Sequence, residues 1–206
     1  MKKNEEKLDV VFVIDKSGSM SGSEENTISS FNEYIEREYN NSYNTTVTTI
    51  LFSDNYNYLY RRKNIKNIKK MTTDDYIVGG CTALYDALGN GINYIDECQT
   101  NKVMFIIITD GYENASKKFN SFKIRNMIKK HKNWEFIYIG ADIDSYATGG
   151  SIGIKKENIA NYKKDTKGTN LLFRSISKFQ DCMMGDCSSD ISWKEELENY
   201  LEDNIE

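Results

Sequence analysis

The sequence predicts an α/β fold: a doubly wound, mostly parallel sheet with helices on both faces and one antiparallel edge strand. Three observations favour it. Apolar, β-branched runs such as Val10 to Ile14 are typical of strands buried on both faces. These runs alternate with segments of helical periodicity, as in α/β domains. Small polar residues follow the strand ends, where sites of such sheets lie.

The elements follow in order along the chain. Strands are expected at Val10 to Ile14, Thr45 to Phe52, Tyr56 to Arg62, Val103 to Thr109, Glu135 to Gly140 and Asn158 to Tyr162. Helices are expected at Ser23 to Tyr39, Thr82 to Glu97, Phe119 to Lys130 and Asn170 to Gln180, with a short helix and turn within Ala141 to Gly153. Within the third of these helices, Phe122 and Ile128 are expected to face inward.

The stretch after the first strand carries the main chemical signal. Asp15, Ser17 and Ser19 stand at alternate positions, and Gly18 permits a tight fold of the backbone between them. A carboxylate and two hydroxyls at the end of a central strand suit Mg²⁺, which prefers oxygen ligands. Taken alone, this short stretch is more typical of a turn that caps a helix.

Two distant residues complete a known pattern. Thr82 follows the glycine pair Gly79-Gly80, and Asp110 ends the run FIIITD. With Asp15, Ser17 and Ser19, they match the order D-x-S-x-S, Thr, Asp of the metal-ion-dependent adhesion site. The chain therefore resembles the von Willebrand factor A family, with its Rossmann-like fold, and in particular its stand-alone bacterial or phage members.

The resemblance implies a function in recognition. Family members with this motif hold Mg²⁺ (or Mn²⁺) at these five residues and use an open coordination position to bind an Asp or Glu of a partner protein. Because Ser17, Ser19 and Thr82 are neutral, the cation would keep much of its electrophilicity. The family also includes intracellular members that work beside ATP-driven machines, so a structural or assembly subunit is an alternative.

Catalysis is a further alternative, because Mg²⁺ beside a strand-end Asp also serves phosphoryl transfer and hydrolysis. Against it, Ser17 stands where aspartate-nucleophile phosphatases usually carry a second acid, and the chain has no G-x-x-x-x-G-K-[ST] phosphate loop. The one histidine, His131, is distant from the motif and is expected to be a surface cation near a helix end. We therefore expect a protein that is not an enzyme.

Composition narrows the class of partner. The 206 residues carry a formal net charge of -4, without the basic surplus typical of nucleic-acid binders. No apolar run approaches the ~20 residues needed to cross a bilayer, and the first residues show no secretion signal. We expect a cytoplasmic protein that binds neither nucleic acid nor membrane.

The C-terminal part differs in character. Residues 1–180 are expected to form the domain, and residues 181–206 an acidic extension in which Lys194 is the one base. Trp193, Leu197, Tyr200 and Leu201 could form one apolar stripe of a docked helix. The extension's acids would also allow metal-linked self-association.

The four cysteines indicate a reducing compartment. Cys81 and Cys98 bracket a predicted helix and are too far apart to pair. A bridge between Cys182 and Cys187 is geometrically allowed and stays open.

Overall fold

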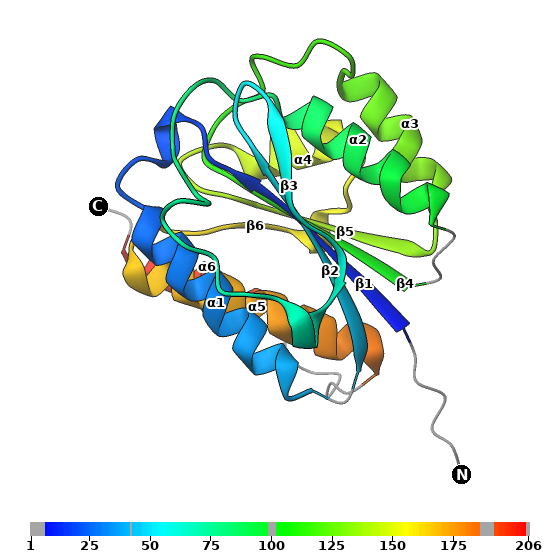
Figure 1. Ribbon diagram of the computed structural model, residues 1–206. Helices are drawn as coiled ribbons and strands as arrows, with labels where there is room; N and C mark the ends of the chain where they lie inside the picture. The colour runs from blue at the N-terminus through cyan, green and yellow to red at the C-terminus, as the bar shows by residue number, and fades with distance from the viewer. Residues whose placement is uncertain (1–6, 42, 99–101, 186–191, 205–206) are drawn as a thin grey trace.

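A single six-stranded sheet lies between two layers of helices (Figure 1). The computed structural model describes residues 7–41, 43–98, 102–185 and 192–204. In this part of the chain, no helix is both long enough and apolar enough to cross a lipid bilayer.

The elements follow the predicted alternation. The strands are β1 (Lys7–Asp15), β2 (Asn44–Phe52), β3 (Tyr56–Asn64), β4 (Lys102–Thr109), β5 (Trp134–Gly140) and β6 (Ile159–Asn161). The α-helices are α1 (Glu24–Tyr39), α2 (Leu84–Glu97), α3 (Ser121–Lys130), α4 (Ser145–Ser151), α5 (Thr166–Met184) and α6 (Glu195–Glu202). Single 3₁₀ turns lie at Gly18–Met20, Ile65–Asn67 and Lys156–Asn158.

The strand order β3-β2-β1-β4-β5-β6 makes β1 and β4 the centre of the sheet. All pairings are parallel except that of β2 with the edge strand β3, which confirms the predicted fold class. From β1 the chain continues to β2 on one side and later returns to β4 on the other side of β1. The direction in which strands are added therefore reverses between β1 and β4, which makes this the topological switch point of the sheet. In open α/β sheets, this is where ligands bind, beyond the carboxyl ends of the strands.

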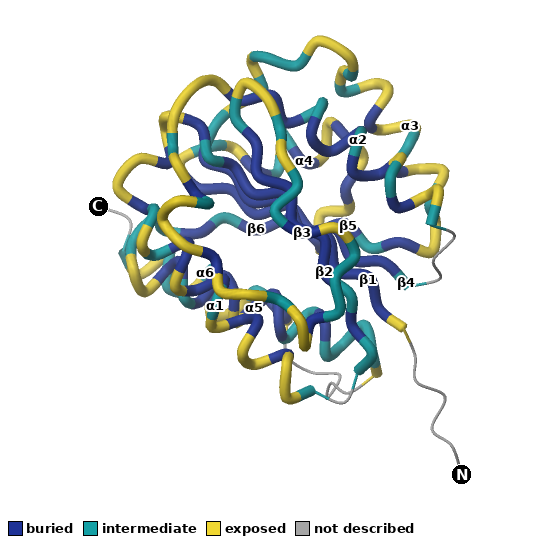
Figure 2. The backbone as a smooth tube through the Cα atoms, viewed as in Figure 1, coloured by how far each residue is buried: buried dark blue, intermediate teal, exposed yellow. Residues whose placement is uncertain are grey.

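The core has two halves because β1 is buried on both faces. Val10, Phe12 and Ile14 face the layer of α1, α5 and α6. Val11 and Val13 face the layer of α2, α3 and α4. Figure 2 shows the strands buried throughout their middle and the outer helix surfaces exposed, as the continuous apolar runs predict.

The prediction that Phe122 points inward is wrong. Its side chain is 71% exposed, whereas Ile124 and Ile128 are buried against the sheet. Ile124 and Ile128 are four residues apart and share a face of α3. Phe122 lies two residues before Ile124, about 200° around the helix, and therefore points to solvent.

The acidic C-terminal part packs on the domain. Residue 181 lies inside α5, which continues to Met184. Leu197 of α6 is fully buried, and Trp193 is 8% exposed and packs edge-on against Phe179. Trp193 Nε1 also donates to the carbonyl of Glu157 at 2.9 Å. Cys187 lies outside the described residues, so whether it pairs with Cys182 stays open; Cys81 and Cys98 form no disulfide.

A partly buried ion pair joins β1 to the edge strand β3. Arg62 donates to both carboxylate oxygens of Asp9, at 2.8 and 3.1 Å, and Asp9 is 3% exposed. Thr46 on the intervening β2 also donates to Asp9. Arg62 has a positive φ of 41° at an irregularity in the pairing of β2 with β3, which lets its side chain reach across the sheet.

His131 ends α3, as predicted, but it is not a surface cation. Its ring stacks on Trp134 with centroids 3.8 Å apart, and its side chain is 9% exposed. Burial lowers the pKa of His131 below its ordinary value of 6.5, although Asp96 at 3.8 Å opposes this. The imidazole is therefore neutral at neutral pH.

Asp9→Ala should lower the free energy of unfolding by about 3 kcal/mol, because it leaves a partly buried guanidinium without its partner. Chemical denaturation measures this. Asp74→Ala is the control, since Asp74 is exposed and its loss should change stability by less than about 0.5 kcal/mol. Equal effects of the two variants would show that the Asp9–Arg62 pair contributes nothing.

His131→Gln should make the protein less sensitive to acid. A histidine whose folded pKa lies below its unfolded value stabilises the fold above the unfolded pKa, and this stability is lost as pH falls below it. Denaturation at about pH 7 and about pH 5 should therefore show a smaller loss for His131→Gln than for the wild type. A loss of the same size in both proteins would contradict the stacked, neutral imidazole.

Candidate functional site

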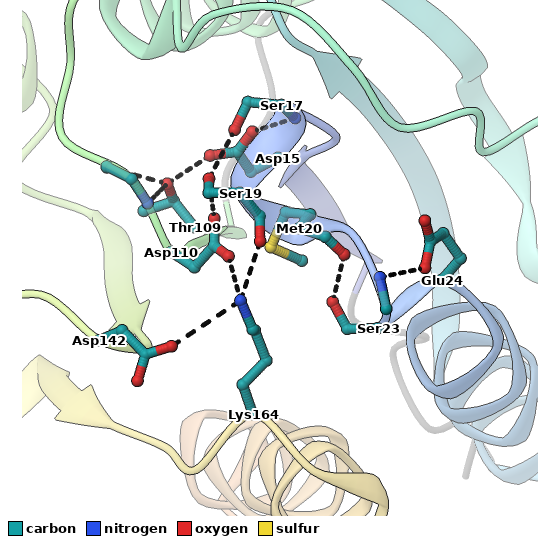
Figure 3. Close-up of polar contacts among 12 residues, drawn as sticks. Asp15, Ser17, Ser19, Met20, Ser23, Glu24, Thr109, Asp110, Asp142 and Lys164 are labelled. Atoms are coloured by element: carbon teal, nitrogen blue, oxygen red, sulfur yellow. Dashed lines mark hydrogen bonds and ion pairs between the residues drawn. The ribbon is translucent and has the colours of Figure 1, made fainter.

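The site is built on Asp15, the last residue of the central strand β1 (Figure 3). Its carboxylate is fully buried, and both oxygens have donors. Oδ1 accepts the backbone N–H of Ser17 at 2.7 Å, and Oδ2 accepts the hydroxyl of Thr109 at 2.6 Å. The hydroxyl of Tyr76 in turn donates to the backbone carbonyl of Asp15. Asp15 is therefore held rigidly where β1 ends.

The pKa of Asp15 reflects the burial of its carboxylate. Burial raises the pKa of Asp15 above its usual range; the bonds from Thr109 and Ser17 oppose this, and the nearby negative charge of Asp110 adds to it. A cation placed beside Asp15 would offset the cost of burying its negative charge.

Ser17 and Ser19 connect the two carboxylates. Their hydroxyl oxygens are 3.1 Å apart, and Ser19 donates its hydroxyl to Asp110 Oδ1 at 2.5 Å. Asp110 follows directly after β4, the parallel neighbour of β1, so the two strand ends bring the acids together. Ser17 and Asp110 are buried whereas Ser19 is exposed, so the set opens to solvent at Ser19.

Thr82 reaches the same place from a third loop. A Cβ added to Gly111 would lie 2.9 Å from Thr82 Oγ1 and 3.3 Å from Ser19 Oγ, so both hydroxyls lie over the bare Cα of Gly111. Asn114 fixes Thr82 through two bonds, from Thr82 N to its side-chain oxygen at 2.9 Å and from its own N to Thr82 O at 3.0 Å. Thr82 precedes α2, which begins at Leu84 rather than at Thr82 as predicted.

Close backbone contacts join these loops. Gly18 N donates to Gly80 O at 3.0 Å, and Gly79 N donates to Lys16 O at 2.9 Å. Gly80 has a φ of +83°, and a Cβ there would lie 1.9 Å from a carboxylate oxygen of Asp54. The glycine pair therefore permits the close approach of these loops.

The donors present fit a hard divalent cation. The structure gathers two carboxylates, from Asp15 and Asp110, and three hydroxyls, from Ser17, Ser19 and Thr82. These oxygen donors are the kind that Mg²⁺ and Mn²⁺ prefer. Because three of the five donors are hydroxyls, the site is not a cluster of acids, and the described ranges contain no cluster of three or more His, Cys, Asp and Glu residues that could hold a metal ion.

The N-terminus of α2 does not add a free anion site. The N–H groups of Tyr85 and Asp86 are taken by Glu113 and Ser116, at 2.8 and 3.0 Å. The first turn of α1 carries Glu24, whose carboxylate accepts from Gly22 N at 2.7 Å. A ligand carboxylate at this site would therefore depend on a cation rather than on helix amides.

Sequence reasoning missed three supporting side chains. Thr109 has a readable signal, because it directly precedes Asp110 at the end of the same strand. Tyr76 and Lys164 have none: they lie 61 and 54 residues from the atoms they contact at Asp15 and Asp110, in segments without a motif. Only the fold brings them to the site.

Solved structures with this fold include proteins named as matrix and pilus components. A mussel byssus protein, proximal thread matrix protein 1, aligns with a TM-score of 0.62 at 17% identity over 84% of this chain and 46% of that one. The type V pili tip protein Mfa5 domain from Porphyromonas gingivalis gives a TM-score of 0.63 at 10% identity over 89% and 97%. The D319A mutant of the PilB minor pilin from Streptococcus sanguinis gives 0.65 at 15% identity over 90% and 64%.

At these identities the likeness concerns the fold, and this chain spans less than half of the mussel protein. No curated protein sequence matches this chain. The sequence does match the family described as von Willebrand factor type A domain, over residues 9–172, which include β1, β4 and all five gathered side chains. This chain therefore belongs to the von Willebrand factor type A domain family.

Proposed function

We propose that the domain binds Mg²⁺ or Mn²⁺ through Asp15, Ser17, Ser19, Thr82 and Asp110 and uses the bound ion to recognise an Asp or Glu of a partner protein. The observation that carries the proposal is that four oxygen-bearing side chains, from three separate loops, gather beside the buried carboxylate of Asp15.

The charge balance favours a carboxylate ligand. Three of the five donors are neutral hydroxyls, so the protein supplies only two carboxylates to a cation of charge +2. The bound site would then carry little net negative charge that could repel a carboxylate of the partner. Ser19 lies on the exposed side, where an incoming side chain can approach. A charged carboxylate should therefore bind better than an amide of the same shape.

The comparisons support metal binding in this fold. One of the mussel byssus structures is described as having a zinc-occupied MIDAS motif; it aligns with a TM-score of 0.56 at 15% identity. The similar structures are named as a matrix protein, a minor pilin and a pilus tip protein, and none of these names denotes an enzyme. A role in binding, as a recognition module or as a subunit of an assembly, agrees with them.

The geometry disfavours the enzymatic alternative. Asp15 is fully buried with both oxygens hydrogen-bonded, so neither is exposed for nucleophilic attack. His131 lies beside Trp134 at the start of β5, at the opposite end of the parallel sheet from the strand ends that carry the site. It cannot act there as a general base.

Some acidic side chains of the C-terminal extension form ion pairs within the chain, so fewer of them are available to bind the metal ion of a second copy. Glu196 pairs with Lys178 at 2.6 Å, and Glu198 pairs with Lys194 at 3.1 Å. Glu195, Glu202 and Asp203 are exposed on α6 or just after it. A cytoplasmic partner other than a second copy therefore remains our main proposal.

Ser19→Ala should weaken Mg²⁺ binding about 10- to 100-fold, because it removes one ligand oxygen and the donor to Asp110. Isothermal titration calorimetry measures the affinity directly. Ser21→Ala is the matched control: this exposed serine lies in the same loop, and its side chain has no contact with the five donors. If both variants bind as tightly as the wild type, the metal site is misplaced.

Partner binding should be lost in EDTA, return with Mg²⁺ or Mn²⁺, and be absent in Thr82→Ala. Affinity capture with the wild type in the presence of Mg²⁺ supplies candidate partners. Replacing the partner's critical Asp by Asn, or Glu by Gln, should then cost several kcal/mol of binding free energy, since the ion loses a charged ligand. A partner that binds equally well in EDTA and to Thr82→Ala uses another surface.

A further inference from the structure

Lys164 brings a positive charge into the proposed metal site. Its Nζ atom lies 2.8 Å from Asp110 Oδ2 and 2.8 Å from the backbone carbonyl of Ser19. Figure 3 shows the side chain rising from the segment before α5 toward these two groups. Among the described residues, no other cationic side chain forms an ion pair with one of the five donors.

The contact is well shielded from water. The side chain of Asp110 is 1% exposed and that of Lys164 is 23% exposed. An ion pair at this depth is screened less by salt than a surface pair. The ammonium of Lys164 is therefore a close and weakly screened counter-charge to Asp110.

The backbone around Lys164 is firmly anchored. Tyr162 is buried and its N–H donates to Gly140 O at 2.9 Å. On the other side, Asp165 caps α5 by accepting the N–H of Gly168 at 2.7 Å. Gly168 packs so closely that a Cβ there would lie 2.0 Å from Lys163 O. Lys164 is thus directed at the site by the fold rather than by a mobile loop.

The two carboxylates of the site are compensated differently. Asp15 has hydrogen bonds from neutral donors, whereas Asp110 shares one oxygen with Ser19 and the other with the ammonium of Lys164. A divalent cation that takes Asp110 as a ligand must share it with Lys164 or displace the ammonium. Asp142 offers a second acceptor, since its Oδ2 lies 3.8 Å from Lys164 Nζ.

We propose that Lys164 competes with the metal ion for Asp110. Its ammonium pairs with the Asp110 carboxylate and thereby lowers the affinity of the site for a divalent cation. The inference rests on the proposed metal site and adds a residue that sets how tightly this site holds its ion. Metal binding would release the ammonium toward Asp142 and solvent.

Lys164→Met should raise the affinity for Mg²⁺ and Mn²⁺ about tenfold, because it removes a positive charge a few ångströms from the ion while keeping the apolar length of the side chain. Lys164→Arg keeps the charge and should bind close to wild-type affinity. Lys163→Met is the matched control: Lys163 is adjacent in sequence but contacts Asp165 and Asn204 rather than the site. Calorimetry with MgCl₂ and MnCl₂ compares all four proteins.

Thermal unfolding gives a second readout that does not depend on measured affinity. In EDTA, Lys164→Met should be less stable than Lys163→Met, because Asp110 loses its counter-charge. Saturating Mg²⁺ should reduce or reverse this difference, because the ion then supplies the missing charge.

The outcomes separate this inference from the proposed function. The role of Lys164 is supported if Lys164→Met binds the metal ion more tightly than the wild type and the other two variants do. Measurable binding by Lys164→Met also supports it if the wild type binds too weakly to measure. Equal or weaker binding by Lys164→Met, with Ser19→Ala still impaired, overturns the role of Lys164 and leaves the metal site intact. If no variant binds metal at millimolar concentration, the proposed function fails and the inference fails with it.

Discussion

The structure depends on a charged group held at the end of its most buried strand. Asp15 lies at the end of β1, between β2 and β4, and its side chain is fully shielded from water. Such a carboxylate is costly to bury unless hydrogen bonds or a cation compensate it. The bonds from Thr109, Ser17 N–H and the network through Ser19 provide part of this compensation.

This constraint explains why the surrounding loops are so closely joined. Gly18, Gly80 and Gly111 each lie where another residue's backbone or side chain comes close. The contacts bring the loops after β1, after β3 and after β4 into one cluster. The strand order places the first and third of these side by side, and the glycine pair at 79 and 80 brings in the second.

The sequence was informative where local rules decide the structure. Apolar runs located the strands, and the spacing of Asp15, Ser17 and Ser19 after a buried strand singled out the loop of the proposed site. It was uninformative where distant segments meet. Lys164 and Tyr76 carry no local signal, and the bonding of Arg62 to Asp9 depends on strands that are neighbours only in the folded sheet. The prediction for Phe122 was wrong because the sequence of this short helix did not show which of its faces is buried. The prediction for His131 was wrong because its stacking partner, Trp134, belongs to the next strand.

The segment after residue 172 is part of the folded domain. The family match ends at residue 172, inside α5, yet the core continues through Ile176 to Trp193 and Leu197. Lys194 and Trp193 donate to carbonyls of Ile159 and Glu157, at the outer strand β6 and the turn before it. A protein fragment cut at the family boundary would lack these contacts and present a three-residue edge strand without its cover. Unprotected strand edges promote aggregation, so a fragment cut at residue 172 should aggregate more readily than the longer chain.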